Sequence, residues 1–88
     1  MTTVEQLLGI EYPILQGAMA NISTHKLVGP VSEAGGLGII GACGMSADQL
    51  REEIRLTRAI TNKPFGVNLM LQMPNRDELV QVILEEGI

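Results

Sequence analysis

The sequence predicts an α/β fold with a parallel sheet, because strand-like and helix-like segments alternate along the chain. The strand-like segments span residues 12–20, 36–44 and 64–71, and an amphipathic segment follows each of them. A strand, helix, strand order implies parallel strands that are joined by right-handed crossovers. We therefore expect three neighbouring parallel strands with helices between them.

The repeat has the length of one unit of a TIM (β/α)8 barrel. The strands are expected to begin near Tyr12, Leu37 and Phe65, which is the spacing of βα pairs. A complete barrel takes about 250 residues, so 88 residues supply roughly three of its eight units. We expect residues 1–88 to be the N-terminal part of a single TIM-barrel domain, with the barrel incomplete in this chain.

The composition favours an aliphatic core and argues against a polyanionic partner. Hydrophobic residues make up 45% of the chain, with one Phe, one Tyr and no Trp, which suits buried parallel strands. The formal net charge is −4, and the six Lys and Arg residues are scattered. Nucleic acid and anionic membranes are therefore not expected partners.

Cysteine use and hydropathy bear on the compartment. Cys43 is the only cysteine and cannot form an internal disulfide, and no His or Cys spacing fits a zinc site. No apolar run approaches the roughly 18 residues of a membrane helix, and the first residues lack the basic and apolar regions of a signal peptide. The sequence predicts a cytoplasmic protein without a metal site.

The first helix is short and precedes the first strand. Thr2 or Thr3 can cap it, and it is expected to continue through Leu8 and to end at Gly9. It would lie over the closed end of the barrel.

The second helix follows the first strand. Ser23 or Thr24 can begin it, and the Gly35–Gly36 pair ends it. Three residues form the face that we expect to be buried: Leu27, Val31 and Ala34. Pro30 lies inside this helix and is expected to kink or shorten it, because proline removes a backbone donor and clashes with the preceding turn.

The third helix has the clearest signals. Ser46 and Gln49 have the spacing of a capping box, and the helix is expected to run to about Thr61, before Pro64. Its expected buried stripe is Leu50, Ile54 and Thr57. It also carries a run of charges that we interpret as a solvated helix face: Arg51, Glu52, Glu53, Arg55 and Arg58.

The fourth helix has capping signals like those of the third. Asn75 and Glu78 have capping-box spacing, and Gly87 is a suitable C-terminal stop. The expected apolar face is Leu79, Val80, Ile83 and Leu84.

The first candidate site follows the first strand. Gln16 is followed there by Gly17, Ala18, Met19 and Ala20. Ligands of parallel α/β sheets bind at the carboxyl ends of the strands, and small residues there let a flat ligand lie against backbone amides. A tight turn that merely needs glycine explains the same residues equally well, so both interpretations stay open.

The second candidate site ends the second strand. Gly41, Ala42, Cys43 and Gly44 leave it almost free of side chains. Cys43 is the only potential nucleophile, but no His or basic residue adjoins it, so a structural cysteine is favoured. The run AGGLG precedes its strand and is therefore not a dinucleotide-binding fingerprint.

The third candidate site lies on the third strand. Alternation places two sets on opposite faces: Gly66, Asn68 and Met70 against Phe65, Val67 and Leu69. The second set should face the helices, so Asn68 should point into the barrel, where its amide needs a partner. A planar heterocycle with donors and acceptors would be one, and a hydrogen bond to a neighbouring strand's side chain is a slightly less favoured alternative.

Three segments resemble the N-terminal part of the flavin-dependent enoyl-acyl-carrier-protein reductases, the second type of bacterial enoyl reductase. They are YPILQGAMA, VSEAGGLGIIGA and KPFGVNLML, the last followed by a proline and a helix that ends in EEG. The resemblance runs from about Leu8 to Ile88. The chain is almost as similar to the nitronate monooxygenases, formerly called 2-nitropropane dioxygenases, but FGVNLMLQMP is closer to the reductases.

The resemblance implies a TIM barrel that binds FMN at its carboxyl-terminal face. It implies that NAD(P)H reduces the flavin and that the flavin passes hydride to the double bond of an enoyl thioester in fatty-acid synthesis. The implied partners are a small-molecule or acyl-carrier-protein-linked enoyl substrate and a second copy of the full-length protein in a homodimer.

The resemblance also implies which residues contact the cofactor. Gly17, Ala18 and Met19 would approach the isoalloxazine through their backbone, Gly41 and Ala42 would line its edge, and Asn68 would hydrogen-bond to it. The family's catalytic histidine and phosphate-binding loops belong to later strands that this sequence does not contain.

His25 is the only histidine, and it does not match the family's catalytic one. A solvated histidine at a helix start is favoured over a catalytic one. We therefore expect no catalytic residue in this chain and no activity from the 88 residues alone.

Two alternatives remain beside the reductase hypothesis. In a nitronate monooxygenase, reduced flavin would meet oxygen instead of an enoyl chain. In the second alternative the chain is a complete, non-catalytic α/β module that associates through open sheet edges.

Overall fold

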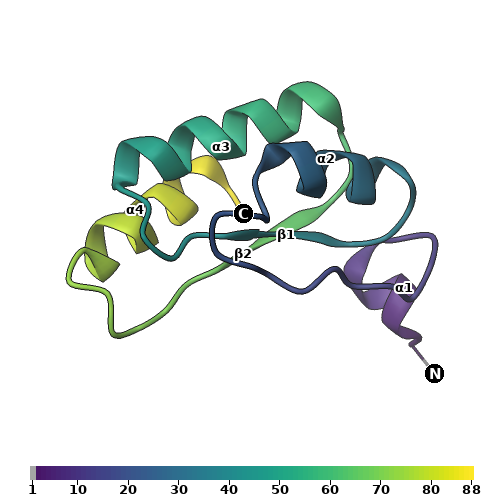
Figure 1. Ribbon diagram of the computed structural model, residues 1–88. Coiled ribbons are helices and arrows are strands. Elements are labelled where there is room, and N and C mark those ends of the chain that lie inside the picture. Colours follow the sequence, from purple (N-terminus) through teal and green to yellow (C-terminus); the bar gives the residue numbers. More distant parts are fainter. Residues whose placement is uncertain (1) are drawn as a thin grey trace.

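The computed structural model describes residues 2–88, in which helices cover one face of a small parallel sheet (Figure 1). The elements in chain order are α1 (Val4–Leu8), α2 (His25–Glu33), β1 (Gly38–Gly41), α3 (Ala47–Ile60), β2 (Phe65–Asn68) and α4 (Arg76–Glu86). None of the helices within residues 2–88 has the length and apolar character needed to cross a bilayer.

The sheet is parallel, as predicted. Strands β1 and β2 pair in a register that runs from Gly38 opposite Phe65 to Gly41 opposite Asn68. The segment predicted as the first strand lies along the other edge of β1, but it makes only one bridge, between Leu15 and Leu37. The predicted order of three neighbouring parallel segments is therefore confirmed. The predicted lengths are wrong, because the first segment makes a single bridge and the other two, predicted over 36–44 and 64–71, are four-residue strands.

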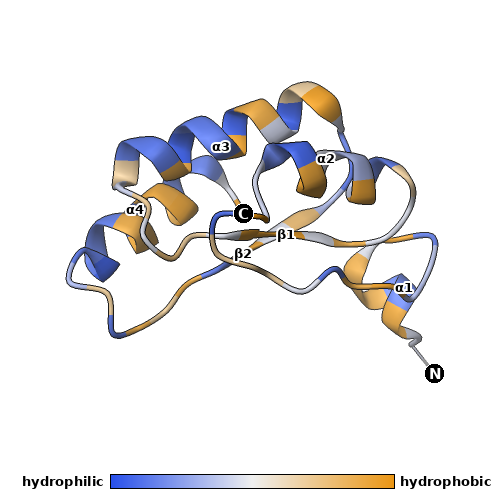
Figure 2. Cartoon of the chain, viewed as in Figure 1, coloured by the Kyte–Doolittle hydropathy of each residue, from blue (hydrophilic) through white to orange (hydrophobic). Residues whose placement is uncertain are grey.

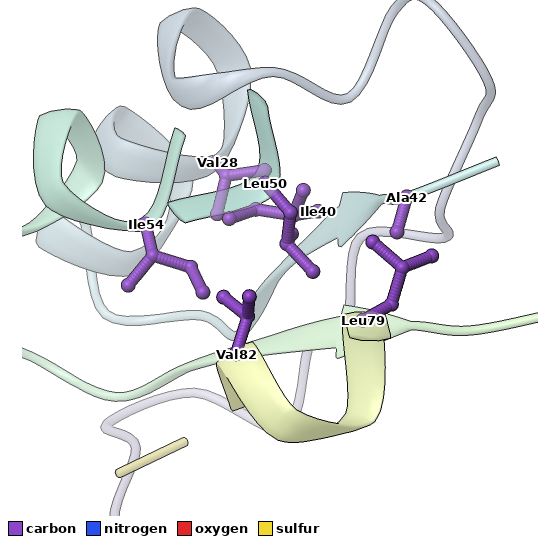
Figure 3. Close-up of a cluster of buried hydrophobic side chains, with 7 residues drawn as sticks. All are labelled: Val28, Ile40, Ala42, Leu50, Ile54, Leu79 and Val82. Carbon is purple, nitrogen blue, oxygen red and sulfur yellow. The ribbon is translucent and has the colours of Figure 1, made fainter. Parts of the chain in front are cut away.

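The core lies between the sheet and its helices (Figure 3). It is aliphatic, as the composition predicts, and its buried members are Val28, Ile40, Ala42, Leu50, Ile54, Leu79 and Val82. Phe65 and Val67 of β2 and Leu69, which follows it, pack against this cluster. The predicted helix-facing set of the third strand is thus confirmed.

Local signals set most helix ends. The Thr3 hydroxyl and the Gln6 side chain form a capping box at α1, and Gly9 ends this helix in the left-handed region. Thr24 caps α2 by accepting a hydrogen bond from the Lys26 amide.

The predicted buried face of α2, which was Leu27, Val31 and Ala34, is wrong, because the buried face is shifted by about one residue along the helix. Val28, Gly29 and Ser32 are the buried residues, and Ala34 is exposed. The Ser32 hydroxyl accepts a hydrogen bond from the Gly38 amide at 2.9 Å, so a polar contact with β1 helps to orient the helix. The helix continues through Pro30 to Glu33, so Pro30 does not end it.

The third helix matches its prediction. Ser46 and Gln49 form the capping box, and Leu50, Ile54 and Thr57 are the buried stripe. Figure 2 shows α3 as mainly hydrophilic, with hydrophobic residues that recur along it.

The fourth helix departs from its prediction at its start and on its buried face. The Asn75 side chain makes no cap and instead donates to the Met45 carbonyl at 3.0 Å. Leu79 and Val82 are buried, whereas Val80 and Leu84 are exposed. Gly87 ends the helix in the left-handed region, as predicted.

The charge run on α3 is not a simple solvated face. Arg51 contacts Glu85 at 2.5 Å and Glu86 at 3.0 Å, and Arg55 and Arg58 also reach the Glu86 carboxylate. These contacts join α3 to α4, so the charges have a structural partner that the sequence spacing did not reveal.

Candidate functional site

The loop that follows Leu15 is the centre of the candidate site. Gln16 and Ser23 shape it from within: the Gln16 amide donates to the Ser23 hydroxyl at 3.0 Å, and the Met19 N–H donates to the same hydroxyl at 2.7 Å. Ser23 is 1% exposed, so this hydroxyl is a buried acceptor shared by both donors. This network leaves the backbone N–H groups of Gly17 and Ala18 without an acceptor among residues 2–88.

Gly17 is not a glycine that the fold requires. Its φ angle lies outside the left-handed region, and a Cβ atom at this position would meet nothing within 4 Å. A turn that needs glycine therefore does not explain this residue, although the sequence left that interpretation open. A ligand that lies against the Gly17 backbone would explain it, because a side chain there would occupy the space of the ligand.

Gly41 has a packing reason for its missing side chain. A Cβ atom there would lie 3.0 Å from the Met19 carbonyl oxygen and 3.1 Å from its carbon. The Gly41 N–H donates to the Ser23 carbonyl at 3.1 Å. Gly41 thus lets the loop lie directly against β1 and brings Met19 beside the strand.

Asn68 completes a row across the sheet. It is the register partner of Gly41, which in turn contacts Met19, so the three predicted site residues are neighbours. The Asn68 side chain is exposed and makes no hydrogen bond within residues 2–88. Its backbone carbonyl accepts from the Ala42 N–H at 3.2 Å. The alternative of a side-chain partner on a neighbouring strand is therefore not realised in this part of the chain.

The side chain of Ala42 points away from this row. It is fully buried in the core near Leu79 (Figure 3). Only its backbone could line a ligand on the other face of the sheet. Cys43, the next residue, is a free thiol of intermediate exposure.

The sequence prediction missed the contact between His25 and Glu53. One oxygen of the Glu53 carboxylate accepts the His25 backbone N–H at 2.8 Å and lies 2.7 Å from the imidazole Nδ1. The contact ties the first turn of α2 to α3, so His25 is not simply solvated. No sequence signal pairs two residues that are 28 positions apart.

Gln16 belongs to the first candidate site of the sequence, but no role was predicted for its side chain, and Ser23 was not predicted as a site residue. Their shared hydrogen bonds depend on how the loop folds back, which local patterns do not encode. The capping position of Ser23, next to Thr24, was the only signal that pointed to it.

Two surface depressions lie beside the loop, with volumes of about 460 and 500 Å³. Asn21 and Thr24 line both of them together with side chains of α2 or α3, whereas none of the six predicted cofactor-binding residues lines either one. The candidate site in this chain is therefore an open face of the sheet. In residues 2–88, no group of His, Cys, Asp and Glu side chains suits a metal ion.

The candidate site offers hydrogen bonds rather than titrating groups. None of its six predicted members is a carboxylate, a basic side chain or an imidazole. Free amide N–H groups at Gly17 and Ala18 and a side-chain amide at Asn68 supply donors and one acceptor beside a flat backbone. This set suits an uncharged planar heterocycle with acceptor and donor atoms on its edge.

The shifted pKa values belong to the contact between α3 and α4. Hydrogen bonds from Arg51 and Gln81 lower the pKa of Glu85, and those from Arg55 and Arg51 lower the pKa of Glu86. In turn, the Glu85 carboxylate raises the pKa of Arg51. These groups stabilise helix packing and include no member of the candidate site.

Comparison with known proteins gives a consistent family. The family model for nitronate monooxygenase matches residues 1–86. The chain is 50% identical over 68 residues to the nitronate monooxygenase of Paraburkholderia phytofirmans, which covers 77% of this chain and 19% of that protein.

A second curated relative comes from Mycobacterium tuberculosis and is named (3aS,4S,5R,7aS)-5-hydroxy-7a-methyl-1-oxo-octahydro-1H-indene-4-carboxyl-CoA dehydrogenase. It is 36% identical over 87 residues, which are 99% of this chain and 24% of that protein. The chain thus spans about a quarter or less of the length of these curated relatives.

Among solved structures, FabK from Thermotoga maritima matches the whole chain. The TM-score is 0.95 and the sequence identity is 52%, with 100% of this chain and 28% of that chain covered. A mutant of the same protein, M276A, gives a TM-score of 0.96.

Proposed function

Because the family match extends over residues 1–86, the chain belongs to the nitronate monooxygenase family, and we propose that the protein is an FMN-dependent enoyl-acyl-carrier-protein reductase of this family. In this proposal the protein reduces enoyl thioesters with NAD(P)H in fatty-acid synthesis. It acts in the cytoplasm as a homodimer, on a small-molecule or acyl-carrier-protein-linked enoyl substrate.

The match to FabK is the observation that favours enoyl reduction over nitronate oxidation. FabK is an enoyl-acyl-carrier-protein reductase, and its identity of 52% extends over the whole chain. The nitronate monooxygenase of P. phytofirmans reaches 50% over only 77% of the chain. The Mycobacterium relative is named for a CoA-linked substrate, which also favours an acyl thioester.

The residues of the candidate site fit a flavin. Gly17 leaves open space against the backbone, and the N–H groups of Gly17 and Ala18 have no acceptor within residues 2–88. Asn68 offers a free side-chain amide on the same face as Gly41. When bound, FMN would supply the hydride chemistry that no side chain can provide.

Each predicted residue then has a binding role. Gly17 and Ala18 would hold the flavin through their backbone N–H groups. Met19 would only line it, because its N–H donates to Ser23 and its carbonyl accepts from Ile22 and Ser23. Gly41 keeps the loop against β1. The Ala42 backbone would line the edge of the ring, and the Asn68 amide would orient it by a hydrogen bond.

The same proposal extends to the fold. The segment around Leu15, β1 and β2 lie side by side in chain order, and all are parallel. This order is that of consecutive strands in a TIM barrel. We propose that they are the first three strands of a TIM barrel whose other units lie outside these 88 residues.

No residue of this chain is proposed to transfer a proton to substrate. His25 is the only histidine, and its Nδ1 is engaged by Glu53 at the contact between α2 and α3. We therefore propose that residues 1–88 alone do not turn over substrate.

A nitronate monooxygenase is the second candidate. The family model and the 50% identity to the P. phytofirmans protein favour it. The two candidates share the flavin-binding residues and differ in what oxidises the reduced flavin.

The deciding experiment uses the protein as expressed from its native gene. We expect it to retain FMN and to oxidise NAD(P)H without oxygen when a crotonyl thioester is added. Oxygen uptake with propyl-2-nitronate, without thioester reduction, would establish the second candidate instead. A protein that neither carries FMN nor binds added FMN would overturn both.

A matched pair of variants ties the activity to the candidate site. Asn68→Ala removes the proposed flavin contact, whereas Asn62→Ala changes an exposed asparagine just before β2. We expect FMN affinity to fall about tenfold in the first variant only, as for the loss of a hydrogen bond to a buried ligand.

A further inference from the structure

The side chain of Gln16 makes two hydrogen bonds to β1 that backbone groups would make in a regular parallel sheet. Its Oε1 accepts the Ile39 N–H at 3.1 Å, and its Nε2 donates to the Ile39 carbonyl at 3.2 Å. One side-chain amide therefore pairs with both peptide groups that Ile39 presents to this edge of β1.

A regular parallel ladder would pair these groups differently. The preceding step is regular, because the Leu37 N–H donates to the Ile14 carbonyl and the Gln16 N–H donates to the Leu37 carbonyl, both at 2.9 Å. Continuing the pattern by two residues would pair the Ile39 N–H with the Gln16 carbonyl and the Ile39 carbonyl with the Ala18 N–H. The Gln16 side chain occupies both positions instead.

The displaced loop is held in its new course by Ser23. The hydroxyl of Ser23 accepts from the Met19 N–H and from the Gln16 amide, and it lies 3.4 Å from the Gly17 carbonyl oxygen. The Met19 N–H therefore has an acceptor, whereas the N–H groups of Gly17 and Ala18 have none within residues 2–88. The N–H groups of Ala20 and Asn21 also have no acceptor within residues 2–88, but those of Gly17 and Ala18 are the ones that directly follow the segment paired with β1.

We propose that Gln16 is a positioning residue that keeps the Ala18 N–H out of the sheet and so presents the Gly17 and Ala18 amides to the ligand. That the ligand is a flavin rests on the function proposed above. The role of Gln16 in the ladder rests only on the hydrogen bonds of this chain.

The variant Gln16→Met tests this role in the full protein expressed from its native gene. Methionine keeps the length of the side chain but cannot pair with Ile39, so the Ala18 N–H is expected to take the Ile39 carbonyl. Without FMN, hydrogen exchange in the peptide that spans residues 16–20 should slow by about tenfold or more. FMN affinity should fall by about tenfold, as for one lost hydrogen bond.

Ser32→Ala is the matched control. It removes another side-chain hydrogen bond to β1, from the Gly38 N–H, but on the opposite side of the strand from the loop. We expect it to lower thermal stability while exchange in residues 16–20 and FMN affinity stay at the wild-type values. Equal effects of the two variants on both quantities would reduce Gln16 to a general stabilising residue and overturn the proposal.

A second variant covers a failure of Gln16→Met to fold. Gln16→Glu keeps an acceptor for the Ile39 N–H and loses the donor to the Ile39 carbonyl, so the Ala18 N–H is again expected to be drawn into the sheet. Unchanged exchange in whichever variant folds would refute the role of Gln16. If the wild-type protein never binds FMN and the variant still exchanges more slowly than the wild type in residues 16–20, the role of Gln16 is supported and the proposed flavin is refuted.

Discussion

At the scale of single residues, two glycines that look alike in the sequence have different causes. Gly41 is required by packing, since its missing side chain admits the Met19 carbonyl. Gly17 has an ordinary backbone conformation and faces space that is open within residues 2–88, so no contact in this part of the chain selects glycine there. Only the second kind of glycine points to a ligand.

This difference leads to a prediction for Gly17→Val. The free energy of unfolding should change by less than about 0.5 kcal/mol, because the added Cβ atom meets no atom of residues 2–88 within 4 Å. FMN affinity should fall at least about tenfold, because the valine occupies the space proposed for the ring. Urea unfolding and flavin fluorescence titration measure the two quantities on the full protein.

Gly41→Ala is the control, because it is expected to lower the free energy of unfolding, which Gly17→Val should leave nearly unchanged. Its Cβ atom would press on the Met19 backbone at 3.0 Å, so unfolding should become easier by about 1–3 kcal/mol. If Gly17→Val destabilised the protein as much as Gly41→Ala and left FMN binding intact, Gly17 would be a structural glycine.

The sequence placed Met19, Gly41 and Asn68 in candidate sites, and Gln16 with them, but it did not predict that Gln16 and Ser23 support the loop. The sequence pointed to Gly41 and Asn68 because a small residue at a strand end and a mid-strand amide stand out against an apolar background, and to Met19 because it follows Gly17 and Ala18. Gln16 and Ser23 did not stand out as a pair, since their hydrogen bonds form only after the loop has folded against β1. Their role is a property of the tertiary structure.

At the scale of elements, helix ends were more predictable than helix faces. The caps at Thr3, Ser46 and Gly87 are local, because donor and acceptor lie within a few residues. The buried face of α2 depends on where β1 lies, and the Ser32 contact with Gly38 helps to turn it by one position. The long stripe of α3 was predicted correctly because its period is repeated over several turns.

The contact between α3 and α4 predicts how stability depends on pH. Arginine side chains lower the pKa of Glu85 and Glu86 below the ordinary value of 4.5, so the folded protein binds fewer protons than the unfolded chain. This stabilisation is present above pH 4.5 and is lost as the pH falls from there through the lowered pKa values. It should also weaken at high salt, because Glu85 and the arginine side chains are partly exposed to solvent, although Glu86 itself is only 11% exposed.

The test compares the wild type with Glu86→Gln by urea unfolding from pH 7 to pH 3. We expect the difference in unfolding free energy to be present at pH 7 in low salt and to shrink below pH 4.5 and in 1 M NaCl. Glu52→Gln is the control, since Glu52 lies exposed on α3 and forms no ion pair within residues 2–88. A difference that does not vary with pH or salt would show that Glu86 acts through packing instead.

At the scale of the whole molecule, one face of the sheet is covered and the other is open. The helices α2, α3 and α4 lie on the covered face (Figure 1), where the core cluster is. Large apolar side chains outside the helices are exposed: Ile14, Leu15, Ile22, Met70 and Leu71. The sequence predicted this arrangement through the alternation of Phe65 to Met70, which assigns one face to helices and leaves the other for partners.

The open face predicts that a polypeptide of residues 1–88 alone associates with itself. Exposed apolar groups on this scale are typical of interaction surfaces, so the apparent mass should rise with concentration and the dye ANS should bind. Light scattering after gel filtration and ANS fluorescence measure these effects. Met70→Lys should weaken both, because Met70 belongs to the set that faces away from the helices, whereas Val4→Lys on α1, at an apolar residue of similar exposure, should change neither. A polypeptide that stays monomeric and binds no ANS at every concentration would mean that the face closes on itself, which would also argue against a flat flavin on it.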